Sequence, residues 1–244
     1  MNPLGHNSSE GINLTTSDGP FDLSYNNITS PGSYGMQING VTATAGNPSK
    51  IINNSIGGGF RGISNLNGGI RMLGTMANVQ VYYNSINFDN GPGSALNVRV
   101  STVTNVDIRN NSFVYSGAGI GNAMYLNSST LTANNLDHNN YFSNGTAFVY
   151  YGAARADLPA LQAVNSPAGN DLNSISGDPV YTSSTDLFPT SGILINSGTP
   201  IASVTTDILG EQRSATNPDI GAYEMPASTC FGTPTPGTAT SSLT

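Results

Sequence analysis

The chain has 244 residues, only 9% of them charged, and a formal net charge of −7 from 14 acidic and 7 basic residues. Seven basic residues are too few to neutralise the phosphate backbone of a nucleic acid. We therefore expect no nucleic-acid partner. No run of 18 apolar residues occurs, so we expect no membrane insertion. The single cysteine, Cys230, excludes an internal disulfide framework.

A six-residue pattern of hydrophobe, two variable residues, asparagine, one further residue and hydrophobe recurs five times. Its first example is Leu23-Ser-Tyr-Asn-Asn-Ile28 and its fourth is Ile108-Arg-Asn-Asn-Ser-Phe113. The invariant asparagines, 27 to 30 residues apart, are Asn26, Asn54, Asn84, Asn111 and Asn139. A period of this length predicts a solenoid.

A second pattern lies between these: a small residue, a hydrophobe, any residue and another hydrophobe, as in Gly35-Met-Gln-Ile38 and Ala123-Met-Tyr-Leu126. Such alternation predicts strands. Each period then holds short strands and one bend, and it buries its apolar side by stacking on its neighbours. The sequence therefore predicts an all-β solenoid of about five coils.

The recurring asparagine suits the bend, because asparagine tolerates a left-handed backbone and its amide satisfies local polar groups. Stacked once per coil, these amides can also bond to one another as an asparagine ladder. The bend asparagines and the small-residue strand starts resemble the right-handed parallel β-helix superfamily. The resemblance covers about residues 10–152 and implies that fold, but it does not fix the chemistry.

We expect residues 1–152 to form the coils, with Gly57-Gly58-Gly59 as a flexible loop because it lacks the lysine of a phosphate-binding loop. No amphipathic helix precedes Gly11 to cover the first coil. Solenoids normally need a polar cap there. Either further coils precede Met1, or another element packs on that end.

Residues 153–225 are expected to cap the coils. Ala153 to Val164 is expected to be a short helix with Asp157 as its N-cap. The run from Ser176 to Glu224, which we call the closing segment, resembles the C-terminal closing segment of many bacterial secreted β-helix proteins. The resemblance implies a cap, in which Arg213 can pair with Asp219 or Glu224.

Residues 226–244, rich in Thr, Pro, Ser and Gly, are expected to be a linker towards further domains of the same chain. Their sequence resembles the start of immunoglobulin-like modules in giant bacterial surface proteins. With the low lysine content, this favours an extracellular or cell-surface location. The resemblance further implies surface anchoring by the type IX route of gliding bacteria.

The outward positions of the small-residue strands form the candidate ligand-binding surface. Amides, arginines and tyrosines side by side suit the hydroxyls and carboxylates of glycans. The first row is Asn13, Gln37, Arg71, Asn97, Tyr125 and Val149, and the second is Thr15, Asn39, Leu73, Arg99, Asn127 and Tyr151. The candidate binding residues are Gln37, Arg71, Asn97, Arg99, Tyr125 and Asn127. A plainly polar sheet face is the alternative.

These twelve positions contain no Asp or Glu. A glycosidase needs two carboxyl groups about 5 to 10 Å apart, so we expect none on this surface. A lyase needs a charge neutraliser and a base, which Arg71 or Arg99 with Tyr125 supply. With two distant histidines and one cysteine, we expect no metal site, no cofactor and no catalytic triad. Arg109 and Asp137 are expected to form an ion pair between coils.

The leading functional hypothesis is a non-catalytic module of a large secreted bacterial surface protein of the adhesin type, which contacts glycans or a solid surface. A polysaccharide lyase acting on acidic glycans is the second hypothesis. A purely structural stalk spacer is the third.

Overall fold

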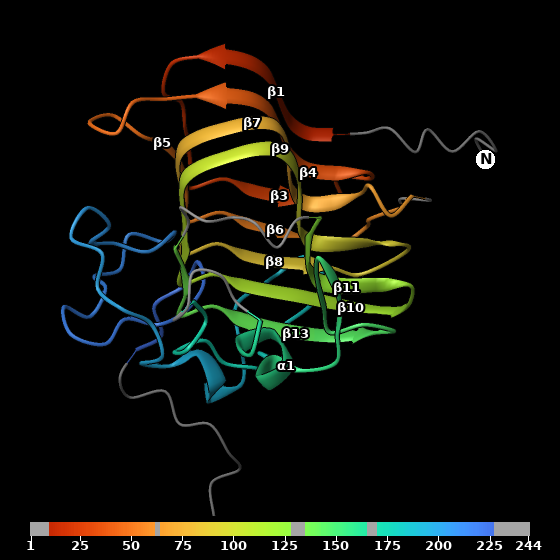
Figure 1. Ribbon diagram of the computed structural model, residues 1–244. Coiled ribbons are helices and arrows are strands. Elements are labelled where there is room, and N and C mark those ends of the chain that lie inside the picture. Colours follow the sequence, from red (N-terminus) through yellow and green to blue (C-terminus); the bar gives the residue numbers. More distant parts are fainter. Residues whose placement is uncertain (1–9, 62–63, 128–134, 165–169, 227–244) are drawn as a thin grey trace, which may run out of the picture.

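The computed structural model describes residues 10–61, 64–127, 135–164 and 170–226. The chain forms a parallel β-helix of about five coils, as the sequence predicts. Figure 1 shows the coils stacked from β1 at one end to β13 and α1 at the other. Coils stack because each strand pairs in parallel with the equivalent strand of the next coil, one period further along the chain.

Two parallel sheets form the walls of the β-helix. The larger contains β1 (Glu10–Asp18), β4 (Tyr34–Thr42), β7 (Gly68–Tyr82), β9 (Gly93–Arg109), β11 (Gly121–Leu126) and β14 (Val149–Tyr151), in that order. Beyond a bend, each coil continues in a second strand segment. These segments lie side by side in the order β2 (Asp22–Ser24), β5 (Ser49–Ile52), the second half of β7, the second half of β9 and β12 (Asn135–Asp137). The smaller sheet contains β3 (Asn27–Thr29), β6 (Ser55–Gly57), β8 (Ser85–Phe88), β10 (Ser112–Gly119) and β13 (Asn140–Gly145).

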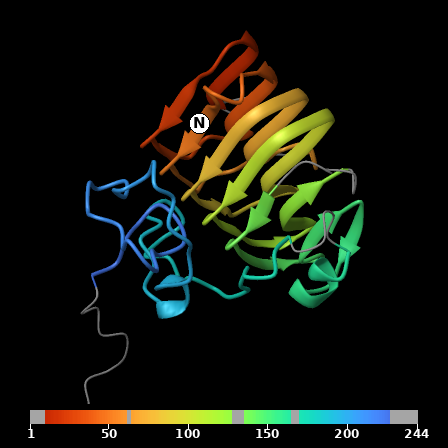
Figure 2. The ribbon, with the colours of Figure 1, turned by 60° about the vertical axis from the view of Figure 1, so that its left-hand side comes forward.

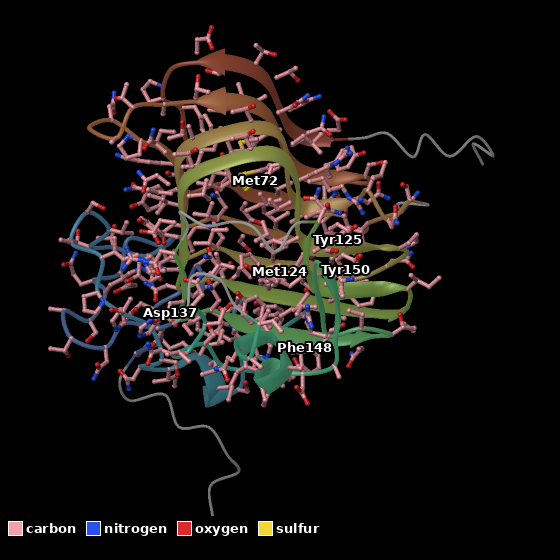
Figure 3. All side chains as sticks on the ribbon, in the orientation of Figure 1. Met72, Met124, Tyr125, Asp137, Phe148 and Tyr150 are labelled. Atoms are coloured by element: carbon pink, nitrogen blue, oxygen red, sulfur yellow. The ribbon has the colours of Figure 1, made fainter. Side chains whose placement is uncertain are left out.

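The core lies between the two sheets and is continuous along the stack. The alternating hydrophobes of the larger sheet point inward, and Figure 3 shows Met72 and Met124 inside the coils. From the smaller sheet, Phe113 stacks on Tyr141 of the next coil with ring centroids 5.9 Å apart. Each large apolar side chain buried in this way contributes roughly 1.5 to 3 kcal/mol.

The five bend asparagines stand in one file and bond to one another. Asn84 shows the pattern: its Nδ2 donates to Asn111 Oδ1 of the following coil at 2.8 Å and to the Ile51 carbonyl of the preceding coil at 2.9 Å. Its Oδ1 accepts from the backbone N–H and from the Nδ2 of Asn54. Each inner amide therefore links three coils.

The left-handed backbone was predicted at these asparagines, and that assignment is wrong. The residue with positive φ is the one before each of them: Tyr25, Asn53, Tyr83, Asn110 and His138, with φ between 52° and 60°. The invariant asparagine is required by the ladder, in which its side chain both donates and accepts. The left-handed position accepts several residue types because their side chains point to the outside, where those of Tyr25, Asn53, Tyr83 and Asn110 contact the closing segment.

The predicted helix at Ala153 to Val164 is shorter than expected. Residues Ala153–Arg155 form β15, which pairs antiparallel with β14. Helix α1 (Leu158–Gln162) follows, and the Asp157 side chain accepts from Ala160 N at 2.8 Å as its N-cap. Leu161 is fully buried against the core, so α1 covers the last coil.

The stack ends on residues 171–175, which pair with the last coil. Ile175 N donates to the Asn139 carbonyl at 2.8 Å, and Tyr141 N donates to the Ile175 carbonyl at 3.1 Å. The Ser174 hydroxyl accepts from Asn139 N at 3.0 Å, where an inner coil would present an asparagine amide. A serine thus terminates the ladder at this end.

The closing segment then runs back along the side of the coils, which the sequence did not predict (Figures 1 and 2). It covers the outer face of the smaller sheet, where a file of serines is buried. The contacts are Ala222 N to Ser85 Oγ at 2.9 Å, Tyr181 OH to Ser112 Oγ at 2.8 Å and Tyr223 OH to Ser55 Oγ at 3.3 Å. The segment therefore braces three successive coils.

The Gly57-Gly58-Gly59 run, predicted as a flexible loop, has a packing role instead. A Cβ on Gly57 would lie 2.5 Å from the Ser184 carbonyl oxygen, and one on Gly58 would lie 2.4 Å from Thr185 Cγ2. Gly58 and Gly59 also have φ near +70°. Gly57 and Gly58 therefore let the closing segment approach the coils.

Arg213 joins the closing segment to the bend. It pairs with Glu224 at 3.2 Å, donates to Asn53 Oδ1 at 2.8 Å and lies 3.9 Å from the centroid of the Tyr83 ring. Of the two predicted acid partners, Glu224 is the one it pairs with. The Asp219 carboxylate instead accepts from two backbone N–H groups, both at 2.7 Å.

The predicted ion pair between Arg109 and Asp137 does not form, although the two residues are neighbours in register. Arg109 pairs with Asp107, two residues away on the same strand, at 2.6 Å, and Tyr82 OH also donates to that carboxylate. Asp137 accepts from Asn173 N and Nδ2 at the end of the stack. Cys230 and residues 227–244, with the predicted linker, lie outside the described residues.

Candidate ligand-binding face

The outward side chains of the larger sheet form two rows across the coils, which we call the Arg/Tyr face. Backbone register aligns the positions of the first row from one coil to the next. The first row is Asn13, Gln37, Arg71, Asn97, Tyr125 and Tyr150, and the second is Thr15, Asn39, Leu73 and Arg99, with Asn127 following β11.

The predicted register of the last coil is wrong by one residue. Val149 is fully buried opposite Met124, so the outward residue is Tyr150, opposite Tyr125. Tyr151, predicted in the second row, is fully buried as well. Three consecutive large hydrophobic residues at Val149–Tyr151 give no alternation, and a shift of one residue exchanges the two faces of a strand.

A chain of hydrogen bonds links the first three coils. Arg71 Nη1 donates to Gln37 Oε1 at 2.8 Å, and Gln37 Nε2 donates to Asn13 Oδ1 at 3.3 Å. Asn13 Nδ2 then donates to Glu10 Oε2 at 2.6 Å. Glu10 lies in neither predicted row, because the strand begins one residue earlier than Gly11. It is the one acid among the described residues that hydrogen-bonds into this face.

Arg71 also donates to the Tyr34 hydroxyl at 2.7 Å, with its guanidinium 4.8 Å from the centroid of that ring. Partial burial lowers the pKa of Arg71, and the positive charge of Arg99 lowers it further, whereas Tyr34 and Glu10 raise it. Its Nε is buried and has no hydrogen-bond partner in the described part of the chain. The site therefore holds a partly desolvated cation, which an anionic ligand would stabilise.

Arg99, Tyr125 and Tyr150 form a stack along the axis of the β-helix. The Arg99 guanidinium lies 3.9 Å from the centroid of Tyr125, and the Tyr125 and Tyr150 rings stack with centroids 4.5 Å apart and planes 6° apart. Figure 3 shows the two tyrosines next to each other on adjacent strands. Both faces of Tyr125 are covered, so a sugar ring cannot stack on it.

The edges of the two tyrosine rings are available instead. Within the described residues, neither the Tyr125 nor the Tyr150 hydroxyl makes a hydrogen bond, so both can donate to a ligand or accept from one. Arg99 donates from Nε to Asn97 Oδ1 and from Nη2 to the Asn65 carbonyl, which leaves Nη1 without a partner among the same residues. The stack therefore presents a guanidinium edge and two phenol groups.

A hollow of about 370 Å³ lies beside this stack. Tyr125 and Tyr150 form one wall, and Ser94, whose Oγ donates to Asn122 Oδ1 at 2.6 Å, forms another. Ile120, which is 72% exposed, lies at its rim. Its volume lies in the range of about 300 to 1,000 Å³ typical of small-ligand sites.

Asn97 is a predicted binding residue that the structure removes from the candidate set. It is fully buried, and its Nδ2 donates to the carbonyls of Asn65 and Asn67 at 3.0 and 2.9 Å. The end of the loop between β6 and β7 thus covers it, and its role is to hold that loop and Arg99. Asn127 is exposed at the end of β11, where its backbone N–H donates to the Val98 carbonyl of the preceding coil.

The described residues hold no group of three or more His, Cys, Asp and Glu side chains placed to bind a metal ion. The same part of the chain contains no candidate membrane-spanning helix. No protein-family model, no curated protein and no solved structure matches the chain.

Proposed function

We propose that the chain is a non-catalytic binding module of a secreted, cell-surface protein of the adhesin type, and that the Arg/Tyr face contacts acidic glycans. The observation that supports this most is the distribution of charge. The chain has a net charge of −7 and only 7 cations. Arg71 and Arg99 nevertheless lie on one face, into which Glu10 is the one described acid that hydrogen-bonds.

The groups on this face match the chemistry of a carboxylated or sulfated glycan. Guanidinium N–H groups form charge-assisted hydrogen bonds with carboxylates and sulfates, and these are about twice as strong as neutral ones. The free phenol groups of Tyr125 and Tyr150 and the amide of Asn127 suit sugar hydroxyls. Because the groups recur from coil to coil at the strand spacing of about 4.8 Å, the face suits an extended chain better than a single compact ligand.

The cell-surface location and the export route are part of the same proposal. They rest on the resemblance of the closing segment and on the composition of the residues that follow it. A solid surface and further domains of the same chain are additional proposed partners. A stalk spacer is the reading that remains if the Arg/Tyr face binds nothing.

A lyase acting on acidic polysaccharide is the second candidate, and one contact favours it. Arg71 Nη1 lies 2.7 Å from the Tyr34 hydroxyl, which puts a charge neutraliser and a candidate base side by side. The predicted pair of Arg99 and Tyr125 also lies together, but there the guanidinium lies over the ring and, among the described residues, makes no hydrogen bond with the Tyr125 hydroxyl. Tyr34, which the sequence did not single out, is therefore the better candidate for that role.

The test is isothermal titration calorimetry of the purified chain with polygalacturonate, alginate and heparin oligosaccharides, and with neutral cello-oligosaccharides as a comparison. Binding of at least one acidic series, weakened about tenfold or more in Arg99→Gln, supports the proposal. A variant of the single lysine, Lys50→Gln, removes one positive charge on β5, outside the face, and should bind like the wild type. An equal loss of affinity in both variants would show that binding depends on the net charge of the chain and not on the Arg/Tyr face.

The same oligosaccharides separate the two candidate functions. Incubation with the chain, followed by ultraviolet absorbance of unsaturated products, detects a lyase. Turnover that is lost in Tyr34→Phe would support the lyase hypothesis in place of the binding-module hypothesis. If the chain neither binds nor cleaves any of these glycans, the structural stalk spacer is the remaining hypothesis.

A further inference from the structure

The two ends of the β-helix are built differently. At the far end, Ser174 terminates the asparagine ladder, and α1 and residues 171–175 cover the last coil. At the other end, β1 and β3 are the outermost strands of the two sheets, and within the described residues nothing pairs with their outer edges. The first coil therefore presents unpaired backbone groups along two strand edges.

The apolar side chains of the first coil show the same asymmetry. Ile12, Leu14, Phe21, Leu23 and Ile28 are only partly buried, although they point into the core. Their counterparts in the second coil, Met36, Ile38, Ile51 and Ile56, are fully buried because a coil lies on each side of them. One further coil would bury the first set to the same extent.

The asparagine ladder shows what such a coil must supply. In every inner coil, the asparagine Oδ1 accepts from the backbone N–H and the Nδ2 of the asparagine one coil earlier. Asn26 Oδ1 has no such donor among the described residues. Asn26 Nδ2 donates to Ser24 O of its own coil at 3.2 Å, where Asn54 Nδ2 donates to the preceding coil at 2.8 Å. The vacant partner is thus another bend asparagine.

A second copy of this chain does not supply that partner. Two copies meeting by their first coils would place Asn26 Oδ1 opposite Asn26 Oδ1, two acceptors without a donor. They would also bring together Glu10, Asp18 and Asp22, and residues 10–30 contain no Lys, Arg or His. A head-to-tail contact is blocked because the far end is covered.

We propose that the edge formed by β1, β2 and β3 binds one further β-helix coil, in parallel register, and that a separate polypeptide can supply this coil. That coil has a strand, a bend asparagine and a second strand, and it carries basic residues opposite Glu10, Asp18 and Asp22. The asparagine donates to Asn26 Oδ1 and continues the ladder. The mode is strand addition to an exposed sheet edge, with a side chain at the bend that fixes the register.

The probe is a synthetic peptide of residues 94–115, which include Asn111, with the substitutions Ser94→Lys, Thr104→Lys and Asp107→Lys. Backbone register places these three positions in line with Glu10, Asp18 and Asp22. Binding of the fluorescein-labelled peptide to the whole chain is followed by anisotropy. Hydrogen exchange then locates it, and we expect new protection at the amides of β1, β2 and β3. Size-exclusion chromatography with light scattering gives the state of the chain alone, which we expect to be monomeric.

The matched control is the same peptide with Asn111→Ala. It cannot supply the side-chain donor to Asn26, and we expect it to bind about tenfold or more weakly. The Asn26→Ala chain should bind the original peptide equally weakly and should not distinguish the two peptides. Since Asn26 is the outermost member of the ladder and is partly exposed, we expect this variant to fold.

Equal binding of the two peptides by the wild-type chain would overturn the proposal, because the ladder would then not select the occupant. Absence of binding, or protection outside β1, β2 and β3, would also overturn it. A dimer of the chain alone, joined through the first coil, would show that a second copy is the occupant. Each of these results leaves the glycan proposal untouched, since the edge and the Arg/Tyr face are tested with different ligands.

Discussion

Replacing Asn84 by alanine tests the ladder at its centre. Asn84 is fully buried, and its side chain takes part in four hydrogen bonds: two from Asn54 to its Oδ1 and two from its Nδ2, to Ile51 O and Asn111 Oδ1. A buried hydrogen bond contributes about 1 kcal/mol net, and a donor left unpaired costs about 1 to 3 kcal/mol. Because the backbone N–H of Asn54 loses its acceptor, we expect Asn84→Ala to cost about 4 kcal/mol.

The measurement is equilibrium unfolding in urea, followed by far-ultraviolet circular dichroism. Asn27→Ala is the matched control, since Asn27 follows Asn26 on the bend, is exposed and makes no side-chain hydrogen bond among the described residues. It should change the free energy of unfolding by less than about 0.5 kcal/mol. Asn26→Ala, at the partly exposed end of the ladder, should fall between the two. A cost below about 1 kcal/mol for Asn84→Ala would refute the argument that the ladder stabilises the stack.

Three further predictions concern other parts of the structure. Gly69→Ala places a Cβ 2.2 Å from Ile86 Cγ2 and should cost about 1 to 3 kcal/mol in the same urea assay, whereas Gly46→Ala, with nothing within 4 Å, should be nearly neutral. Arg213→Ala should release the closing segment, so that limited proteolysis cuts within residues 176–224 while the coils stay intact; a digestion pattern identical to the wild type would contradict this. Burial raises the pKa of Asp219 to about 6, so the folded chain holds that proton more tightly than the unfolded chain. Its contribution to stability should therefore fall as the pH rises from about 4 to about 6, and urea midpoints of Asp219→Asn should lack this part of the wild-type pH dependence.

The coils were predictable because their information is local and repeated. A fixed spacing of Asn26, Asn54, Asn84 and their successors, with a hydrophobe on each side, specifies the bend and the register at the same time. The same regularity located the outward rows over most of the larger sheet. It failed at Val149–Tyr151, where continuous hydrophobicity removes the alternation that distinguishes the two faces of a strand.

The path of the closing segment was not predictable in the same way. Its contacts with Ser55, Ser85 and Ser112 join residues far apart in sequence and follow no period. Two signals did exist. The small residues after the bend asparagines leave room on the outside of the smaller sheet, and Gly57 and Gly58 provide close approach for backbone.

At the candidate site, the sequence identified the arginines and tyrosines but not their surroundings. Burial of Asn97 depends on how the loop between β6 and β7 folds over it, which no strand pattern specifies. Glu10 and Tyr34 were missed because alternation was counted from the small residue that follows each of them. Counting from the preceding residue would have brought both into consideration.

The most direct test of the central claim is an NMR titration of the isotopically labelled chain with an acidic oligosaccharide that binds it in calorimetry. The claim is that the outward face of the larger sheet is the ligand surface. It predicts shift changes at the side-chain Nε–H of Arg71 and Arg99 and at the rings of Tyr125 and Tyr150, with none in the closing segment. Shift changes confined to residues 176–224, with the four side chains unmoved, would contradict it.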